Sequence, residues 1–207
     1  VTPVHEWSGP TVDGLGPASR IFLKLELFQH TGSFKVRGAL LNILNLTRDD
    51  LKRGVTAISA GNHAIATAYA ARVMGTSAKI VMIKTANALR VELCRYYGAE
   101  IEFAEDAHQG FERVTEIELE ERRPLIHPFE GLRTAMGSAT LGLELAQQVP
   151  DLDLVVVPGE RHRLERERHV ALHQPPDPGE ALVVRARDLR DLLVGLPGAA
   201  VERDLDL

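Results

Sequence analysis

One lysine stands where an extended segment gives way to a helix. Lys35 follows the apolar run 21–27 and a Gly-Ser turn, and it precedes a second apolar run at 39–44. Such a place holds an amine still, and a held amine is a candidate nucleophile. A lone lysine is more often a solvated surface charge, so Lys35 and Arg37 could simply lie in the first helical turn. Two cations beside a helix N-terminus are nevertheless unusual, because the helix dipole opposes them.

A second candidate site is the loop 59–63, which follows a buried-looking apolar run and precedes an Ala-rich helix. Glycine lets the backbone come close to a ligand, and the free amides at a helix start suit a carboxylate. The alternative interpretation is that Asn62 and His63 only cap the helix. The loop consists of Ser59, Ala60, Gly61, Asn62 and His63.

Both segments resemble motifs of one enzyme family. Segment 33–39 resembles the lysine motif of the pyridoxal-phosphate enzymes of fold type II, in particular the threonine/serine dehydratase group, and segment 59–64 resembles their substrate-carboxylate loop. Further matches occur at 97–100, 127–129 and 140–144. The five motifs run in family order between about Leu23 and Pro158, and ordered motifs are more specific than a single one.

The resemblance implies a role for each site residue. Lys35 would be the catalytic residue, forming the Schiff base with pyridoxal 5'-phosphate and then taking the α-proton of the substrate. Phe34 would pack near the cofactor ring, and Asn62 would hydrogen-bond the ring hydroxyl. The metal site of some relatives belongs to a part of the family fold that this chain does not match, so no metal is expected. The substrate carboxylate would be framed by Ser59, Ala60, Gly61, Asn62 and His63.

The implied activity is dehydration and deamination of a small hydroxy amino acid, such as threonine or serine, to a 2-oxo acid and ammonia. Serine racemases of the same group carry a serine where this chain has Ala60, and alanine cannot transfer a proton. Elimination is therefore favoured over a serine racemase-like isomerase. The alternative from a different class is a catalytically inactive fragment or remnant. A homodimer is the expected assembly of a full-length form.

Composition excludes several other classes of protein. The 207 residues are 44% hydrophobic and 26% charged, which is typical of a globular protein. The net charge of −5 and the lack of a basic stripe argue against a nucleic-acid partner. No apolar run has membrane-spanning length and no signal peptide is evident, so we expect a cytoplasmic protein without a membrane partner. The single cysteine, Cys94, lies in a helical pattern and is assigned to packing.

The elements that must position these residues alternate along the chain. Strands are expected at 21–27, 55–59, 79–83, 99–104 and 124–127, and helices at 33–45, 63–74, 87–97 and 108–122. A short helix should follow a cap at Thr47. Regular alternation predicts a parallel sheet with right-handed crossovers, which gathers the loops at the strands' carboxyl ends on one rim.

The resemblance implies an α/β fold of three layers, with parallel sheets and helices on both faces, in which the large domain is incomplete. The expected parts are 1–46, which starts the large cofactor domain; 47–131, a small α/β domain; 132–158, which continues the large domain; and 159–207, a non-homologous tail.

The resemblance stops after a predicted helix at 132–149 and a strand at 153–157. There the family has a glycine-rich loop that binds the cofactor phosphate, whereas this chain continues with Gly159, Glu160 and Arg161. From Gly159 to Leu207 only ten residue types occur, and codons beginning with G or C can encode all of them. We therefore expect a family sequence that is truncated or frame-shifted after about Pro158. The rival interpretation is a genuine appendage with a helix around 185–193.

Overall fold

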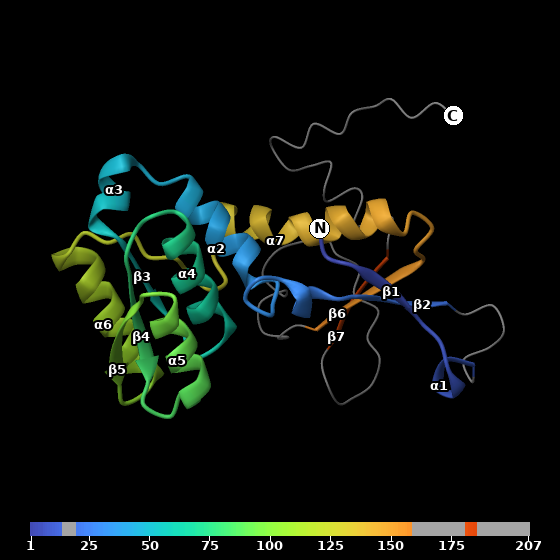
Figure 1. The fold of residues 1–207 in the computed structure, drawn as a ribbon, viewed down its shortest axis with the longest axis horizontal. Helices are drawn as coiled ribbons and strands as arrows, with labels where there is room; N and C mark the ends of the chain where they lie inside the picture. Colours follow the sequence, from blue (N-terminus) through green and yellow to red (C-terminus); the bar gives the residue numbers. More distant parts are fainter. Residues whose placement is uncertain (14–19, 159–180, 186–207) are drawn as a thin grey trace. The chain divides into compact units, whose positions relative to one another are not determined.

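A computed structural model describes residues 1–13, 20–158 and 181–185. The chain forms two compact units, Val1–Leu141 and Gly142–Leu207, which are considered separately. The first unit contains most of the elements (Figure 1): β1 (Val4–Trp7), α1 (Pro10–Asp13), β2 (Ile21–Lys24), the 3-10 turn η1 (Glu26–Phe28), α2 (Lys35–Leu44), α3 (Arg48–Arg53), β3 (Val55–Ile58), α4 (Asn62–Val73), β4 (Ala78–Ile83), α5 (Ala88–Tyr96), β5 (Glu100–Ala104), α6 (Ala107–Glu120) and the greater part of α7 (Leu132–Gln148).

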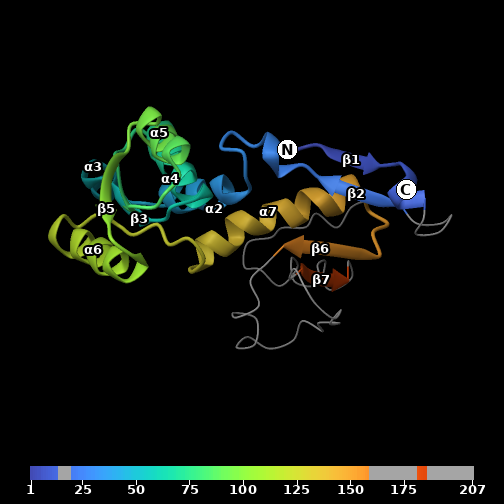
Figure 2. The ribbon, with the colours of Figure 1, turned by 90° about the horizontal axis from the view of Figure 1, so that it is seen from below.

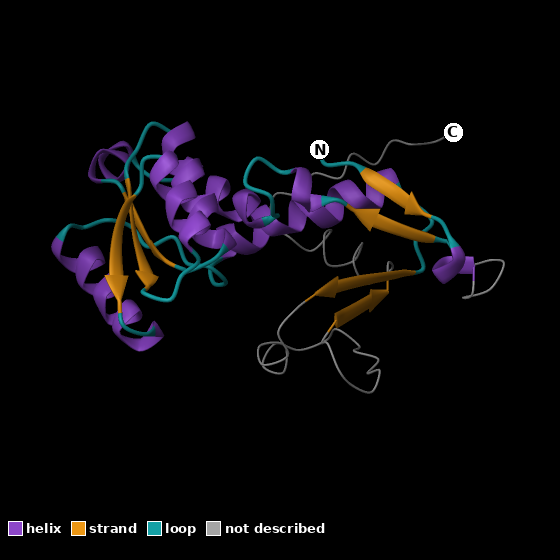
Figure 3. Cartoon of the chain, turned by 60° about the horizontal axis from the view of Figure 1, so that its bottom comes forward, coloured by secondary structure: helices purple, strands orange, loops and turns teal. Residues whose placement is uncertain are grey.

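The centre of the first unit is a parallel sheet of order β3-β4-β5. Its three strands point the same way in Figure 3. Helices α4 and α5 cover one face and α6 the other (Figure 2), so this part of the chain has the three layers that the sequence predicts. A separate antiparallel ribbon pairs β1 with β2.

Burial on both faces explains the apolar central strands. Ile80 and Met82 contribute to the larger hydrophobic core, whereas Val81, between them, contributes to a second core that includes Val114 and Ile117 of α6. Alternate residues of a strand point to opposite faces, so a covered sheet needs an uninterrupted apolar run. The predicted helix 63–74 is largely alanine on its buried side, which lets α4 lie close to the sheet.

Two predicted strands are wrong in extent. The strand expected at 21–27 ends at Lys24, because the chain turns into η1 and so brings Glu26 toward Arg37. The strand expected at 124–127 is reduced to an isolated parallel bridge between Thr56 and Leu125. Prolines at 124 and 128 have no N–H to donate, so a longer ladder cannot form there.

Helix ends follow local sequence signals as expected. Thr47 and Asp50 form a reciprocal capping box at the start of α3. At the end of α4, Gly75 adopts φ +67°, and the amide of Thr76 donates to the carbonyl of Ala71. This is the left-handed C-terminal turn that glycine tolerates best.

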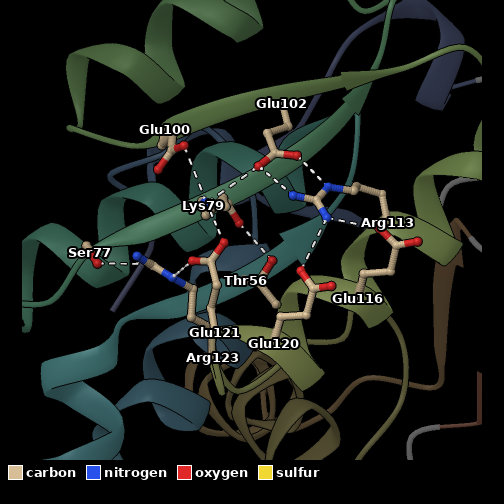
Figure 4. Close-up of polar contacts among 10 residues, drawn as sticks. All are labelled: Thr56, Ser77, Lys79, Glu100, Glu102, Arg113, Glu116, Glu120, Glu121 and Arg123. Carbon is tan, nitrogen blue, oxygen red and sulfur yellow. Dashed lines mark hydrogen bonds and ion pairs between the residues drawn. The ribbon is translucent and has the colours of Figure 1, made fainter.

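A buried lysine organises the polar contacts between the sheet and α6 (Figure 4). Lys79 of β4 is 9% exposed, and its Nζ lies 2.5 Å from Glu121 and 3.5 Å from both Glu100 and Glu102 of β5. The Glu121 hydrogen bond raises the pKa of Lys79. Arg113 of α6 also pairs with Glu102. In the sequence, Glu100 and Glu102 alternate with Ile101 and Phe103, which predicts a strand with one wet face at a sheet edge. The edge position of β5 is confirmed, but its charged face lies against α6.

Helices α2 and α7 approach each other at two glycines. A Cβ on Gly137 would lie 2.5 Å from the carbonyl oxygen of Arg37 and 2.7 Å from the Cα of Gly38. Asn42 of α2 donates a hydrogen bond of 2.9 Å to the hydroxyl of Thr134. The two backbones are in contact at this point, so the close spacing of α2 and α7 requires glycine, which has no side chain, at position 137.

We expect Gly137→Ala to destabilise the fold by about 1–3 kcal/mol, because the backbone of α2 cannot give way to the new methyl group. Gly110→Ala is the matched control. Its Cβ would come closest to the terminal Cδ1 of Ile58, at 2.6 Å, and this end of a side chain can rotate, whereas its other neighbours lie at an ordinary 3.6 Å. Chemical denaturation of both variants measures the difference. An equal or smaller loss for Gly137→Ala would contradict the close approach.

The second unit contains the end of α7 and two antiparallel strands, β6 (Leu154–Pro158) and β7 (Ala181–Arg185). The predicted helix around 185–193 and the predicted break after Pro158 fall largely on residues outside the described part of the chain. The predicted domain boundaries likewise stay predictions. Cys94 is fully buried, and burial raises the pKa of its thiol to about 11, as expected for a packing residue. Among the described residues, no helix combines the length and apolarity needed to cross a membrane.

Candidate functional site

Lys35 is the first residue of α2, and its side chain is held by neighbours. Its Nζ donates a hydrogen bond of 2.9 Å to the carbonyl oxygen of Pro128. The same atom lies 5.2 Å from the ring centre of Phe34 and 4.8 Å from that of Phe129. Aromatic faces attract a cation at this range. The amine is therefore half-buried between two rings and a carbonyl, which is unlike a solvated surface lysine.

The turn that leads into α2 contains two buried hydroxyl groups without a hydrogen-bond partner, Thr31 Oγ1 and Ser33 Oγ. Phe34, the residue before α2, provides no side-chain cap for the helix. Buried polar groups are normally paired, and leaving one unpaired costs about 1–3 kcal/mol. The hydroxyl groups of Thr31 and Ser33, four and two residues before Lys35, are therefore available to hydrogen-bond a bound group.

The loop 59–63 connects the carboxyl end of β3 to α4. Ser59 Oγ accepts a hydrogen bond of 3.1 Å from the amide of Gly61, and Arg90 donates to the carbonyl of Ala60 at 3.4 Å. Gly61 occupies the N-cap position of α4 without a side-chain cap, and Asn62 is exposed as the first helical residue. The simple capping role considered for Asn62 therefore falls to Gly61, and the predicted roles of the loop in ligand binding stay predictions.

His63 faces inward. Its side chain is 4% exposed, and Nε2 lies 2.8 Å from the carbonyl oxygen of Ile126 and 3.4 Å from Thr67 Oγ1. Burial lowers the pKa of His63 to about 4, and the positive charge of Lys35 adds to this shift. The amine and the loop are therefore close enough to interact. If His63 helps to frame a carboxylate, as predicted, it must do so through its backbone amide, because the imidazole is occupied in the core.

The low pKa of His63 predicts a pH-dependent stability. Below pH 6.5 the unfolded chain binds a proton on this imidazole, whereas the folded chain does not until about pH 4. Stability should therefore fall by about 3 kcal/mol as the pH drops from 6.5 to 4.

Chemical denaturation at several pH values between 6.5 and 4 should show the free energy of unfolding falling with pH. The substitution His63→Gln should remove the part of this fall that comes from the imidazole. His108→Gln, at an exposed position of α6, should keep it. An identical slope in all three proteins would contradict the buried neutral imidazole.

The sequence of segment 127–129 indicates a family match but does not indicate its contacts. His127 Nδ1 accepts hydrogen bonds from the amides of Phe129 and Glu130, at 3.2 and 2.8 Å. This turn presents the Pro128 carbonyl and the Phe129 ring to Lys35. The available signal was the position of the motif directly after a predicted strand, where loops of a parallel sheet meet.

Arg37 explains the second cation at the start of α2. Its guanidinium makes two hydrogen bonds of 2.8 Å to the carboxylate of Glu26, and a third of 3.0 Å to Thr140 of α7. Burial works to raise the pKa of Glu26, but hydrogen bonds from Arg37 and Thr2 hold it below its ordinary value. The side chains of Arg37 and Glu26 are only 8% and 12% exposed. The pair joins η1, α2 and α7 beside Lys35.

The described residues fit the aldehyde and the ring of a pyridoxal group, but they do not include a partner for its phosphate. The half-buried primary amine could bind the aldehyde, exposed portions of Phe34 and Phe129 could contact the ring, and the unpaired hydroxyls of Thr31 and Ser33 could bind polar substituents. The phosphate partner expected from the family would follow β6, at residues that the structure does not describe.

Comparisons with known proteins identify the family of the chain. The sequence profile of the family described as "Pyridoxal-phosphate dependent enzyme" matches residues 1–161. The phenylserine dehydratase of Ralstonia pickettii is 52% identical over 142 residues, 69% of this chain and 44% of the relative. The L-threonine ammonia-lyase of Thermotoga maritima is 39% identical over 139 residues, 67% of this chain and 35% of the relative.

Solved structures show the same similarity. A maize serine racemase superposes with a TM-score of 0.69 at 35% identity, over 73% of this chain and 46% of the racemase. The present chain thus spans less than half the length of the relatives and of the solved structure it matches.

Proposed function

Because the chain belongs to the family of pyridoxal-phosphate dependent enzymes, we propose that Lys35 is the residue that binds the cofactor covalently. The observation that supports this most is the position of its amine, 2.9 Å from the Pro128 carbonyl and between two aromatic rings. Phe34 and Phe129 would flank the cofactor ring, and Asn62 would hydrogen-bond the ring hydroxyl.

The proposed reaction eliminates water from a β-hydroxy amino acid. The enamine product tautomerises to an imine, which water hydrolyses to a 2-oxo acid and ammonia, so that ammonia is the only net loss. When bound, the cofactor supplies an electron-withdrawing ring that stabilises negative charge at the substrate α-carbon. Lys35 Nζ takes the α-proton, and amides of the loop 59–63 hold the substrate carboxylate. The phenyl rings of Phe34 and Phe129 lie beside the amine. Threonine and serine are the proposed substrates, and phenylserine joins them because a relative is a phenylserine dehydratase.

Elimination is favoured over racemisation by the residue at position 60. Racemisation requires a proton donor on the face of the substrate opposite the lysine, and a methyl group cannot provide one. Ala60 stands in the loop at that position of the resemblance. Ala60→Ser is therefore the substitution that could add isomerase activity.

A catalytically inactive remnant is the competing proposal, because the chain covers less than half of its relatives. The two are separated by mixing the purified chain with pyridoxal phosphate, recording the absorption spectrum, reducing with borohydride and mapping the label by mass spectrometry. The enzyme proposal expects one stable label on Lys35. No label, or a label distributed over the exposed lysines such as Lys52 and Lys84, would favour the remnant.

A further inference from the structure

The carbonyl that contacts Lys35 belongs to a short segment, 124–130, with few ladder hydrogen bonds. Its first half is attached to β3, because the amide of Thr56 donates to Pro124 at 3.0 Å and the amide of Ile126 donates to Thr56 at 2.8 Å. Beyond Ile126, the strand pairing stops. The position of Pro128 must therefore be set by contacts other than a sheet.

A side chain of α4 supplies such a contact. The carbonyl oxygen of Ile126 is 2.8 Å from His63 Nε2, and a carbonyl can only accept, so Nε2 carries the proton. Ile126 is 2% exposed and His63 is 4% exposed. A buried carbonyl that loses its donor cannot turn to water for a replacement. This hydrogen bond thus fixes the segment where its ladder ends.

Two residues later the same segment meets Lys35. The Pro128 carbonyl accepts from Lys35 Nζ at 2.9 Å, and the local turn on His127 Nδ1 fixes the direction of the chain between the two carbonyls. The path from the imidazole to the amine consists of His63, Ile126, Pro128 and Lys35, and each link is short. His63 follows Asn62 in the first turn of α4, and both residues belong to the loop proposed to bind a carboxylate.

We infer that His63 is a positioning residue for Lys35. Its imidazole holds the segment 126–128, which in turn holds the amine near the loop 59–63. The role is distinct from contact with the substrate, since the imidazole is buried in the core. The inference rests on the proposed function only in taking Lys35 as the reacting amine; the hydrogen bonds themselves do not depend on a cofactor.

The test measures the reactivity of each amine in the folded chain without cofactor. The protein is labelled with a small amount of acetic anhydride, and mass spectrometry compares Lys35 with Lys24, Lys52, Lys79 and Lys84. In His63→Leu the volume is kept and the donor is lost, so segment 126–128 should open more often and labelling of Lys35 should rise about tenfold. His63→Gln keeps an N–H at a similar position and should label like the original protein.

Lys79 makes the experiment decisive, because it is 9% exposed within the same unit. If His63→Leu unfolds the sheet, Lys79 becomes labelled together with Lys35, and the imidazole is only a structural core residue. If Lys35 alone changes and glutamine restores it, the positioning role holds. Unchanged labelling in His63→Leu, or equal labelling in the leucine and glutamine variants, would overturn it. A protein that passes this test yet fails to bind pyridoxal phosphate would refute the proposed function and leave the positioning intact.

Discussion

Under the proposed function, Lys35→Ala should abolish the covalent retention of pyridoxal phosphate and should lower the proposed 2-oxo acid formation by about 10³-fold or more. The substitution removes the amine that lies 2.9 Å from the Pro128 carbonyl and is flanked by two phenyl rings. A covalent catalyst that loses its reactive atom loses most of its rate enhancement. Borohydride labelling and a 2-oxo acid assay measure the two effects.

Lys84→Ala is the matched control for this substitution. Lys84 follows β4, and its side chain is 57% exposed. It should retain both the label and the turnover. Turnover that survives in Lys35→Ala but is lost in Lys84→Ala would overturn the assignment of the reacting amine. Circular dichroism should show an unchanged fold for Lys35→Ala, because the helical hydrogen bonds of α2 do not involve this side chain.

Arg37→Leu should destabilise the first unit by about 2–3 kcal/mol, because the largely covered carboxylate of Glu26 loses its two hydrogen bonds from Arg37 and keeps Thr2 and the charge of Lys24 nearby. The pair is bidentate and joins segments that are distant in the sequence. Chemical denaturation measures the loss. The double variant Arg37→Leu/Glu26→Leu should recover much of it, since no charge is then left buried without a partner.

An exposed pair provides the comparison. Arg20 and Glu6 also form a bidentate contact, at 2.8 and 2.9 Å, but their side chains are 66% and 48% exposed. Arg20→Leu should change the midpoint of denaturation little, because water replaces the lost partner. If Arg20→Leu and Arg37→Leu cost the same, burial of the Arg37 pair would not be the reason for its importance.

Periodicity was enough to predict most of the elements around the sheet. The apolar runs at 55–59 and 79–83 form β3 and β4, and the helices expected at 63–74 and 87–97 are each followed by a glycine with positive φ, at positions 75 and 98. The alternation of charged and apolar residues at 100–103 also predicts the edge position of β5. These features depend on residues close together in the sequence, where pattern and local geometry agree.

Other features depend on contacts between distant residues and could not be predicted from pattern. Lys79 appears as one polar residue in an apolar strand, and nothing nearby shows that Glu121 would lie 2.5 Å away. The early end of β2 comes from the turn η1, which brings Glu26 to Arg37 across a sequence distance that pattern does not reveal. The loss of a strand at 124–127 follows from its prolines. His63 was placed at the site by its motif, but its inward direction depends on Ile126.

The contact of Gly38 with the backbone of Thr134 has a consequence for the order of folding. It closes a loop of about one hundred residues, and closing a loop of this length in an unstructured chain is entropically costly. Folding of the intervening sheet first would bring the loop ends together and shorten the effective loop. During synthesis on the ribosome, the lysine-bearing helix should therefore gain its final support only after the segment around Gly137 has emerged.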